Sequence, residues 1–410
     1  MKSNKNKFII KNKLIMLIKM ITITCAVCIL FCGCSMINKE GKDNNEIEAG
    51  DKAEEDSEKD NNGEKPVIEE AEVDLIQNQI DIMTLEEKIG QMFIVGFDSY
   101  EVDDNIANLI KNKKVGGIIL FGKNIDTIDQ TKRLIKSLNS LNNESKFKLF
   151  MSVDEEGGTV SRIPKEMGQF ESAWNVGTIG DLDYAFDHGK AIGETIKSLG
   201  FNMDFAPVLD VNSNPNNPVI GIRAFSDNPE IVKTLGTEVY KGLRSTGVLA
   251  VGKHFPGHGD TDVDSHVAVP VINKSIDVLR NLELIPFKYA IDNGMNMIMV
   301  SHLYLPQLDN EYVASLSNNI VTKLLREELG FNGVVVTDDM IMEGVKGKYT
   351  TNESAVKAIE AGDDLIIVST GIDDQNSAID GVVEAVKKGI ISEDRINESV
   401  YRILKVKNNM

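Results

Sequence analysis

Side chains that could carry out acid–base or nucleophilic chemistry gather where short apolar runs of the sequence end. Asp154, Glu155 and Glu156 directly follow one such run, and Asp338 and Asp339 follow another. Four of the five histidines lie on or just after the ends of two further runs. Carboxylates and imidazoles are the groups that most often transfer protons or act as nucleophiles in enzymes. The pattern predicts a site assembled from the ends of several apolar segments.

The apolar runs also indicate the fold that positions these side chains. They are rich in Val, Ile, Leu, Phe and Met, and most lack polar alternation, as strands buried on both faces of a parallel sheet do. The segments between them, such as 127–142, 183–199 and 228–246, have helical spacing, and Thr84 to Glu87 form a capping-box sequence. Eight strand–helix units predict an α/β fold of the TIM (βα)8-barrel type, whose active site lies at the carboxyl ends of the strands. The eight expected strands are 92–97, 115–121, 148–153, 201–206, 248–252, 297–301, 333–337 and 365–369.

An open doubly wound sheet is the alternative architecture. It is disfavoured because no Gly-x-Gly-x-x-Gly sequence follows the first expected strand. The barrel is expected to form a single domain over residues 73–410.

Four sequence motifs carry a resemblance to a known family. Residues 154–162 read Asp-Glu-Glu-Gly-Gly-Thr-Val-Ser-Arg, residues 221–225 read Gly-Ile-Arg-Ala-Phe, and residues 336–340 read Val-Thr-Asp-Asp-Met. Residues 253–270 read Lys-His-Phe-Pro-Gly-His-Gly-Asp-Thr-Asp-Val-Asp-Ser-His-Val-Ala-Val-Pro. Together they resemble glycoside hydrolase family 3, and within it the bacterial β-N-acetylhexosaminidases, over residues 80 to 405. Since the chain ends after the expected barrel, it resembles the single-domain form of these enzymes.

The resemblance implies a retaining glycosidase and assigns its catalytic residues. Asp338 corresponds to the nucleophile, His266 to the acid/base, and Asp264 to the carboxylate that orients His266. In an extended loop, side chains two residues apart face the same way, so Asp264 can fix the tautomer of His266 and raise its pKa. Asp339 is expected to be structural, because neighbouring side chains near a strand end face opposite ways. The adjacent pair leaves open substrate-assisted catalysis, in which the acetamido group attacks and two acids assist.

Sugar-binding residues follow from the same resemblance. Asp154 is expected to accept two ring hydroxyls, and Lys253 and His254 are expected to donate to hydroxyls of the same ring. Arg162 and Arg223 match the remaining sugar-contacting arginines. For Arg162, an ion pair with one of the glutamates of its own motif is an equal alternative.

The remaining polar residues of the barrel are expected to have structural roles. No metal or cofactor is expected. Asp210 and His302 are expected to be hydrogen-bonding residues of the barrel rim, and His188 to be an ordinary helix residue. The acidic run 260–265 lacks the Gly and Glu that a calcium loop requires. His254 and His258 could share a zinc-binding face only on a helix, which the intervening Pro-Gly breaks.

The first 34 residues resemble a bacterial lipoprotein signal. Six lysines and no acid occur in residues 1–20, and a largely apolar stretch over 20–31 leads to Phe-Cys-Gly-Cys34. This stretch is shorter than the ~20 residues that span a bilayer. Cleavage would leave Cys34 lipidated, and an uncleaved N-terminal anchor is the alternative. Either places the remaining chain outside the cytoplasm and at the membrane, with residues 35–72 as a disordered acidic linker.

The amino-acid composition limits the kinds of partner that the protein can bind. The net charge of −19 excludes a nucleic-acid-binding face, and all four cysteines lie within the first 34 residues. The resemblance to family 3 implies an exo-acting β-N-acetylglucosaminidase that acts on peptidoglycan fragments or related glycans, and we expect it to be a monomer. The alternatives are a non-catalytic sugar-binding lipoprotein, or a β-glucosidase or phosphorylase on the same scaffold. Phosphorolysis stays open because an imidazole acid/base leaves no carboxylate to repel phosphate.

Overall fold

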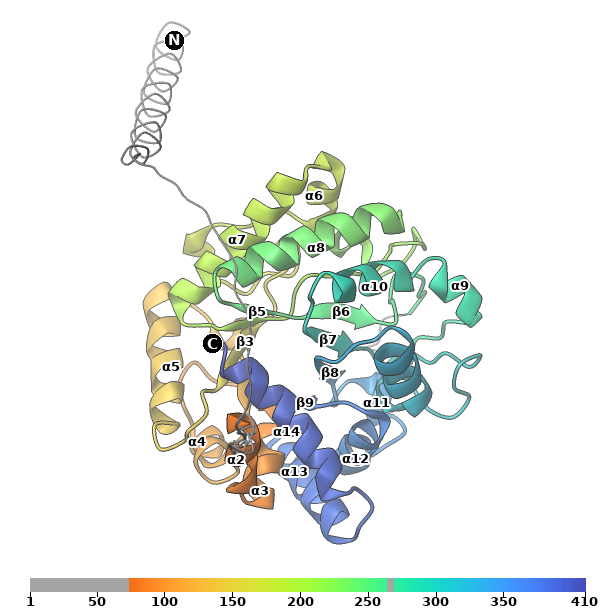
Figure 1. Cartoon of the computed structure of the whole chain (residues 1–410). Coiled ribbons are helices and arrows are strands. Elements are labelled where there is room, and N and C mark those ends of the chain that lie inside the picture. The colour runs from red at the N-terminus through yellow and green to blue at the C-terminus, as the bar shows by residue number, and fades with distance from the viewer. Residues whose placement is uncertain (1–73, 264–268) are drawn as a thin grey trace, which may run out of the picture. The chain divides into compact units, whose positions relative to one another are not determined.

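Parallel strands form the centre of the molecule and helices surround them (Figure 1). The computed structural model describes residues 74–263 and 269–410. Within these residues, nine strand segments pair in the order β5-β4-β3-β2-β1-β9-β8-β7-β6. The segments at the two ends of this order, β5 (Leu249–Ala250) and β6 (Gly252–Phe255), are separated only by Val251, so chain continuity completes the ring. The other strands are β1 (Phe93–Val95), β2 (Gly117–Ile119), β3 (Phe150–Val153), β4 (Met203–Asp204), β7 (Met297–Val300), β8 (Val334–Asp339) and β9 (Leu365–Val368).

The predicted barrel is confirmed, and each of the eight predicted runs contains a strand. β5 and β6 together form the fifth strand position, which is interrupted at one residue. Residues of β1, β2, β3, β7 and β9 are fully buried, as expected for strands covered by helices outside and by packed side chains inside. This buried ring is a rigid support for the polar residues that follow each strand.

The strand pairing shifts by one residue at two positions. Between β6 and β7 the partners are Gly252 with Ile298 and then Phe255 with Val300. Between β8 and β9 they are Val336 with Leu365 and then Asp339 with Ile367. Each shift inserts one extra residue on the strand that carries polar side chains, as a β-bulge does. Bulges re-aim side chains, and these two lie at Lys253-His254 and at Thr337-Asp338.

Most of the described α-helices begin after a residue whose side chain caps the helix. α3 (Leu85–Gln91) has a complete capping box, in which Glu87 N donates to Thr84 Oγ1 over 3.2 Å and Thr84 N donates to Glu87 Oε2 over 2.9 Å. The three predicted helical segments are α5 (Ile128–Leu141), α7 (Leu182–Leu199) and α8 (Pro229–Ser245). The other helices are α2 (Leu75–Asp81), α4 (Asp104–Lys111), α6 (Ala173–Ile179), α9 (Ile276–Arg280), α10 (Leu284–Asp292), α11 (Glu343–Lys346), α12 (Thr351–Ala361), α13 (Ile372–Lys387) and α14 (Glu393–Lys407), with a π-helical segment at Asn319–Glu328.

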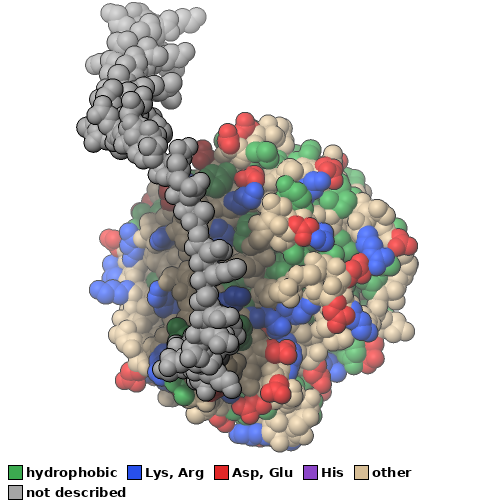
Figure 2. Space-filling view, viewed as in Figure 1, with side chains coloured by type: hydrophobic (Ala, Val, Ile, Leu, Met, Phe, Trp, Pro, Cys, Tyr) green, Lys and Arg blue, Asp and Glu red, His purple; other side chains and the backbone are tan. Residues whose placement is uncertain are grey.

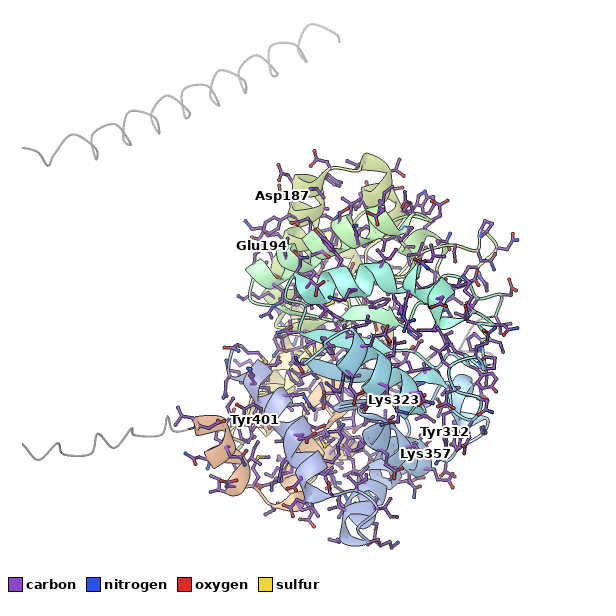
Figure 3. All side chains as sticks on the ribbon, turned by 45° about the vertical axis from the view of Figure 1, so that its right-hand side comes forward. Asp187, Glu194, Tyr312, Lys323, Lys357 and Tyr401 are labelled. Carbon is purple, nitrogen blue, oxygen red and sulfur yellow. The ribbon has the colours of Figure 1, made fainter. Side chains whose placement is uncertain are left out.

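The last helix packs against the first ones. Tyr401 of α14 donates from Oη to Asp74 Oδ2 at the start of α2 over 2.9 Å, and Figure 3 labels Tyr401 beside that helix. Lys88 of α3 pairs with Glu393 of α14 over 2.8 Å. These contacts tie the C-terminal part of the chain to the start of the barrel.

Acidic and basic side chains are interspersed over the face seen in Figure 2. No helix among the described residues is long and apolar enough to cross a membrane.

Candidate active site

A pocket of about 770 Å³ lies at the carboxyl ends of the strands. Its wall takes residues from the ends of β2, β3, β6, β8 and β9, as the barrel prediction requires. The polar part of the wall contains most of the predicted site residues. Among those that line it are Asp154, Arg162, Arg223, Lys253, His254 and Asp338.

Lys253 and Arg223 are bound to two carboxylates that follow β3. Lys253 Nζ lies 2.7 Å from Asp154 Oδ1 and 2.7 Å from Glu156 Oε1. The Arg223 guanidinium holds Glu156 in a two-point pair, with Nε and Nη2 each 2.8 Å from a carboxylate oxygen. Burial alone would raise the pKa of Glu156, but Arg223 and Lys253 hold it well below its ordinary value. Burial lowers the pKa of Lys253, yet Asp154 and Glu156 raise it overall, so Lys253 stays charged.

Glu156 is a site residue that the sequence reasoning did not assign. It lies two residues after Asp154, so in extended backbone both carboxylates face the same side. The two-residue spacing from Asp154 is the feature of the sequence that could have identified Glu156. The chain thereby positions a lysine and an arginine toward one sugar-sized space with their charges balanced.

His254 is held by Asp210 on one side and by Arg223 on the other. Its Nδ1 lies 2.7 Å from Asp210 Oδ2, and its Nε2 lies 3.3 Å from Arg223 Nη2. The carboxylate of Asp210 accepts from Nδ1, so Asp210 fixes the orientation of the His254 ring. The expectation that His254 donates to a sugar hydroxyl stays a prediction. Asp210 is fully buried and also accepts from the backbone N of His258 over 2.7 Å, so it organises the loop after β6.

The second histidine of this loop is neutral. Its Nδ1 lies 3.0 Å from Thr261 Oγ1. Burial and the neighbouring His254 lower the pKa of His258 to about 4. His258 lines the pocket without adding a charge at neutral pH.

The two aspartates at the end of β8 have different acidities. Burial would raise the pKa of Asp338, but His302, His254 and the backbone N of Asp339 lower it below its ordinary value. Burial raises the pKa of Asp339 to about 6, although its Oδ1 accepts from Ser369 N over 3.0 Å. Asp338 is therefore the stronger acid of the two and stays ionised, as a carboxylate nucleophile must be. Both aspartates line the pocket, which differs from the simple alternation expected of neighbours on a strand.

His302 supports the end of β8 from the loop after β7. Its Nε2 lies 3.0 Å from the carbonyl oxygen of Asp339, and its Nδ1 lies 2.7 Å from Ser315 Oγ. A carbonyl can only accept, so Nε2 carries the proton. The fully buried His302 thus fixes the backbone that follows Asp338.

Arg162 lines the pocket instead of pairing with the glutamates of its own motif. Glu156 pairs with Arg223, and Glu155 Oε2 accepts from Ser161 Oγ and from the backbone N of Arg162, each over 2.8 Å. The Arg162 guanidinium donates to the carbonyl oxygen of Ser161 over 3.2 Å. Glu155 therefore shapes the turn that presents Arg162.

Residues 84–406 match the N-terminal domain of glycosyl hydrolase family 3. The chain belongs to this family. A beta-hexosaminidase A from Pseudoalteromonas piscicida is 36% identical over 330 residues, which cover 74% of this chain and 55% of that protein. The chain thus spans about half the length of that relative.

Solved family 3 structures share the barrel. A beta-N-acetylglucosaminidase from Paenibacillus sp. strain FPU-7 is 42% identical with a TM-score of 0.78, over 80% of this chain and 62% of that one. A beta-N-acetylhexosaminidase from Beutenbergia cavernae is 28% identical with a TM-score of 0.75, over 80% of this chain and 99% of that one.

Several predicted residues of this family 3 chain lie outside the described residues. Asp264 and His266 fall between Val263 and Val269, and their roles stay predictions. Cys34, the signal segment 1–34 and the linker 35–72 also fall outside.

One further expectation concerns a residue that the structure describes. His188 lies in α7, where its ring packs near Phe170 and Tyr184, as expected of an ordinary helix residue. Among residues 74–263 and 269–410, no three His, Cys, Asp or Glu side chains are grouped so that they could hold a metal ion.

Proposed function

We propose that this chain is an exo-acting, retaining β-N-acetylglucosaminidase that releases terminal N-acetylglucosamine from peptidoglycan fragments or related glycans. The observation that carries the proposal is the buried, ionised Asp338 in the same pocket as Lys253, Arg223 and Asp154. Relatives of 36% and 42% identity named for hexosaminidase and N-acetylglucosaminidase activity support the choice of sugar.

The pocket suits a two-step mechanism. Asp338 attacks the anomeric carbon, and the bond to the leaving oxygen breaks as that oxygen takes a proton from His266. The glycosyl ester on Asp338 is then attacked by water, which gives its proton to His266, and Asp338 leaves as a carboxylate. Asp154 accepts hydroxyl protons of the ring, and the third proton of Lys253 Nζ donates to a hydroxyl.

The variant Asp338→Asn tests the function. Turnover of nitrophenyl N-acetylglucosaminide should fall by about 10⁴-fold or more, the scale seen when a covalent catalyst loses its nucleophile. Binding of N-acetylglucosamine, measured by calorimetry, should remain. Turnover at the wild-type rate by the variant would overturn the assignment.

The same assay separates the alternatives. Wild-type protein should prefer the N-acetylglucosaminide over the glucoside, and added phosphate should not raise the rate. Faster cleavage of the glucoside, or phosphate-dependent formation of a sugar phosphate, would replace the proposed activity by that of a glucosidase or phosphorylase.

We also propose that the protein acts outside the cytoplasm as a monomer anchored through a lipid on Cys34. The signal-like residues 1–34 and the acidic segment 35–72 support this proposal. Cys34→Ala should move the protein from the membrane fraction to the soluble extracytoplasmic fraction, and mass spectrometry of the wild-type N-terminus should find a diacylated cysteine. An intact N-terminal leader on the membrane-bound wild type would indicate the uncleaved anchor instead.

A further inference from the structure

The segment that follows β6 is hydrogen-bonded to the loop after β4. These bonds lie before the predicted acid/base in the sequence. Asn217 Nδ2 donates to the carbonyl oxygen of His258 over 2.9 Å. Asn214 Nδ2 donates to Asp262 Oδ1 over 2.6 Å, and Asn214 N donates to the carbonyl oxygen of Gly259 over 3.2 Å. The backbone up to residue 262 is thus tied to the loop that follows β4.

The returning part of the segment is fixed on the β7 side. Tyr304 N donates to the carbonyl oxygen of Pro270, and Ile272 N donates to the carbonyl oxygen of Tyr304, each over 2.9 Å. Ile272 is buried in the core, which anchors this part against sliding. Residues 260–262 and 270–274 therefore form two stems, which we call the β6 stem and the β7 stem.

One lysine joins the two stems. Lys274 Nζ, on the β7 stem, lies 3.0 Å from Asp260 Oδ2 on the β6 stem. The same nitrogen lies 2.5 Å from Glu283 Oε1 at the start of α10. Lys274 is 18% exposed in its side chain, and Glu283 is fully buried. A bridging lysine of this kind restricts both stems at once.

Glu283 also contacts the β6 side directly. Gly257 has φ +123°, and a Cβ built there would lie 2.7 Å from the Cβ of Glu283. Burial raises the pKa of Glu283, and the nearby Lys274 opposes that rise. Burial lowers the pKa of Lys274, but its hydrogen bonds to Glu283 and Asp260 raise it overall, so Lys274 stays charged. The bridge is charge-assisted and only partly exposed, which makes it stronger than a surface ion pair.

We propose that Lys274, held by Glu283, is a positioning residue for the proposed acid/base, because it clamps the two stems between which His266 lies in the sequence. The inference rests on the proposed function. An error of about 1 Å in the position of a catalytic group can cost about 100-fold in rate. Lys274 is not among the residues that line the pocket.

Lys274→Met removes the ion pairs to Asp260 and Glu283 while keeping an aliphatic side chain of similar length. Its effect on proton transfer is measured with two aryl substrates whose leaving groups differ in acidity. The phenyl N-acetylglucosaminide needs a proton on its leaving oxygen, whereas the 2,4-dinitrophenyl compound does not. For the phenyl compound, kcat/KM should fall by about 10- to 100-fold, the size expected when an acid/base is misplaced. For the dinitrophenyl compound, kcat/KM should stay within about twofold, since no proton transfer is required in that step. Equal losses on both compounds would overturn the proposal.

Three controls separate positioning from general damage. Lys274→Arg can still bridge Asp260 and Glu283 and should restore the phenyl rate. Lys113→Met removes a partly buried lysine that pairs with Asp380, away from the pocket, and should change neither rate. In a His266→Ala background, Lys274→Met should cause no further loss, because the two residues act through one proton transfer. An additive loss there would contradict the proposal.

The outcome also separates this inference from the proposed function. If the wild-type protein cleaves neither aryl N-acetylglucosaminide, the proposed function fails. If the wild-type protein cleaves both and Lys274→Met behaves like wild type on the phenyl compound, only the positioning role fails.

Discussion

Adjacent glutamates in the segment after β3 show how partners decide the charge of a carboxyl. Burial raises the pKa of Glu155, whose carboxylate accepts from the neutral donors Ser161 Oγ, Arg162 N and Ile163 N. Glu156 is as well buried, but two cations hold its pKa low. Glu156 is therefore the anion that compensates the positive charges of Lys253 and Arg223 beside Asp154. Glu155 instead shapes a turn.

Glu156→Gln tests this difference at the scale of one residue. Removing one member of a buried charge cluster leaves Lys253 and Arg223 poorly compensated, and the free energy of unfolding should fall by about 3–5 kcal/mol. The affinity for N-acetylglucosamine should also fall, because both cations lose the group that orients them. Urea unfolding and calorimetry measure the two effects. Glu155→Gln is the matched control and should cost less in both, and an equal or larger loss in Glu155→Gln would contradict the argument.

Residue identities were largely predictable in this site, whereas the partners that hold each side chain were not. Asp154, Arg223, Lys253 and His254 meet in one pocket as the motifs predict. His254 is held by Asp210 and Arg223, which lie 44 and 31 residues away in the sequence. Spacing along the chain carries no information on such partners.

Strands and helices were predicted well because burial and capping are local signals. Apolar runs marked every strand position, and capping residues such as Thr84 marked helix starts. α6 (Ala173–Ile179), inserted between β3 and α7, was not predicted, since its seven residues are too few for a clear helical period.

Register was not predictable from the alternation of side chains. The register shift between β8 and β9 falls beside Asp338 and Asp339, and an unbroken period of two does not predict it. Asp339, expected to be structural, accepts from Ser369 N through its Oδ1. The shift between β6 and β7 falls beside His254 in the same way. Both irregularities fall on strands that carry site residues, so regular-strand reasoning fails where it matters for chemistry.

At the scale of the whole barrel, the last helix packs against the first strand–helix units. Lys407 at the end of α14 donates from Nζ to Gln91 Oε1 over 2.8 Å and to the carbonyl oxygen of Gly116 over 2.7 Å. The same nitrogen lies 4.5 Å from the centroid of the Phe150 ring. One side chain thereby joins α14 to α3, to the segment before β2 and to β3. Because Lys407 is buried, its protonation is coupled to the folding of the barrel.

That coupling predicts a pH dependence of stability. Burial lowers the pKa of Lys407 to about 7, whereas in the unfolded chain a lysine holds its proton to about pH 10.4. Between these values the unfolded chain binds more protons, so the free energy of unfolding rises with pH, by up to about 4 kcal/mol from pH 7 to pH 10. Lys407→Met should lack this rise, whereas Lys405→Met, which alters an exposed residue of the same helix, should keep it. Urea unfolding across this pH range measures both variants against wild type, and parallel curves for wild type and Lys407→Met would show that Lys407 keeps its proton in the folded barrel.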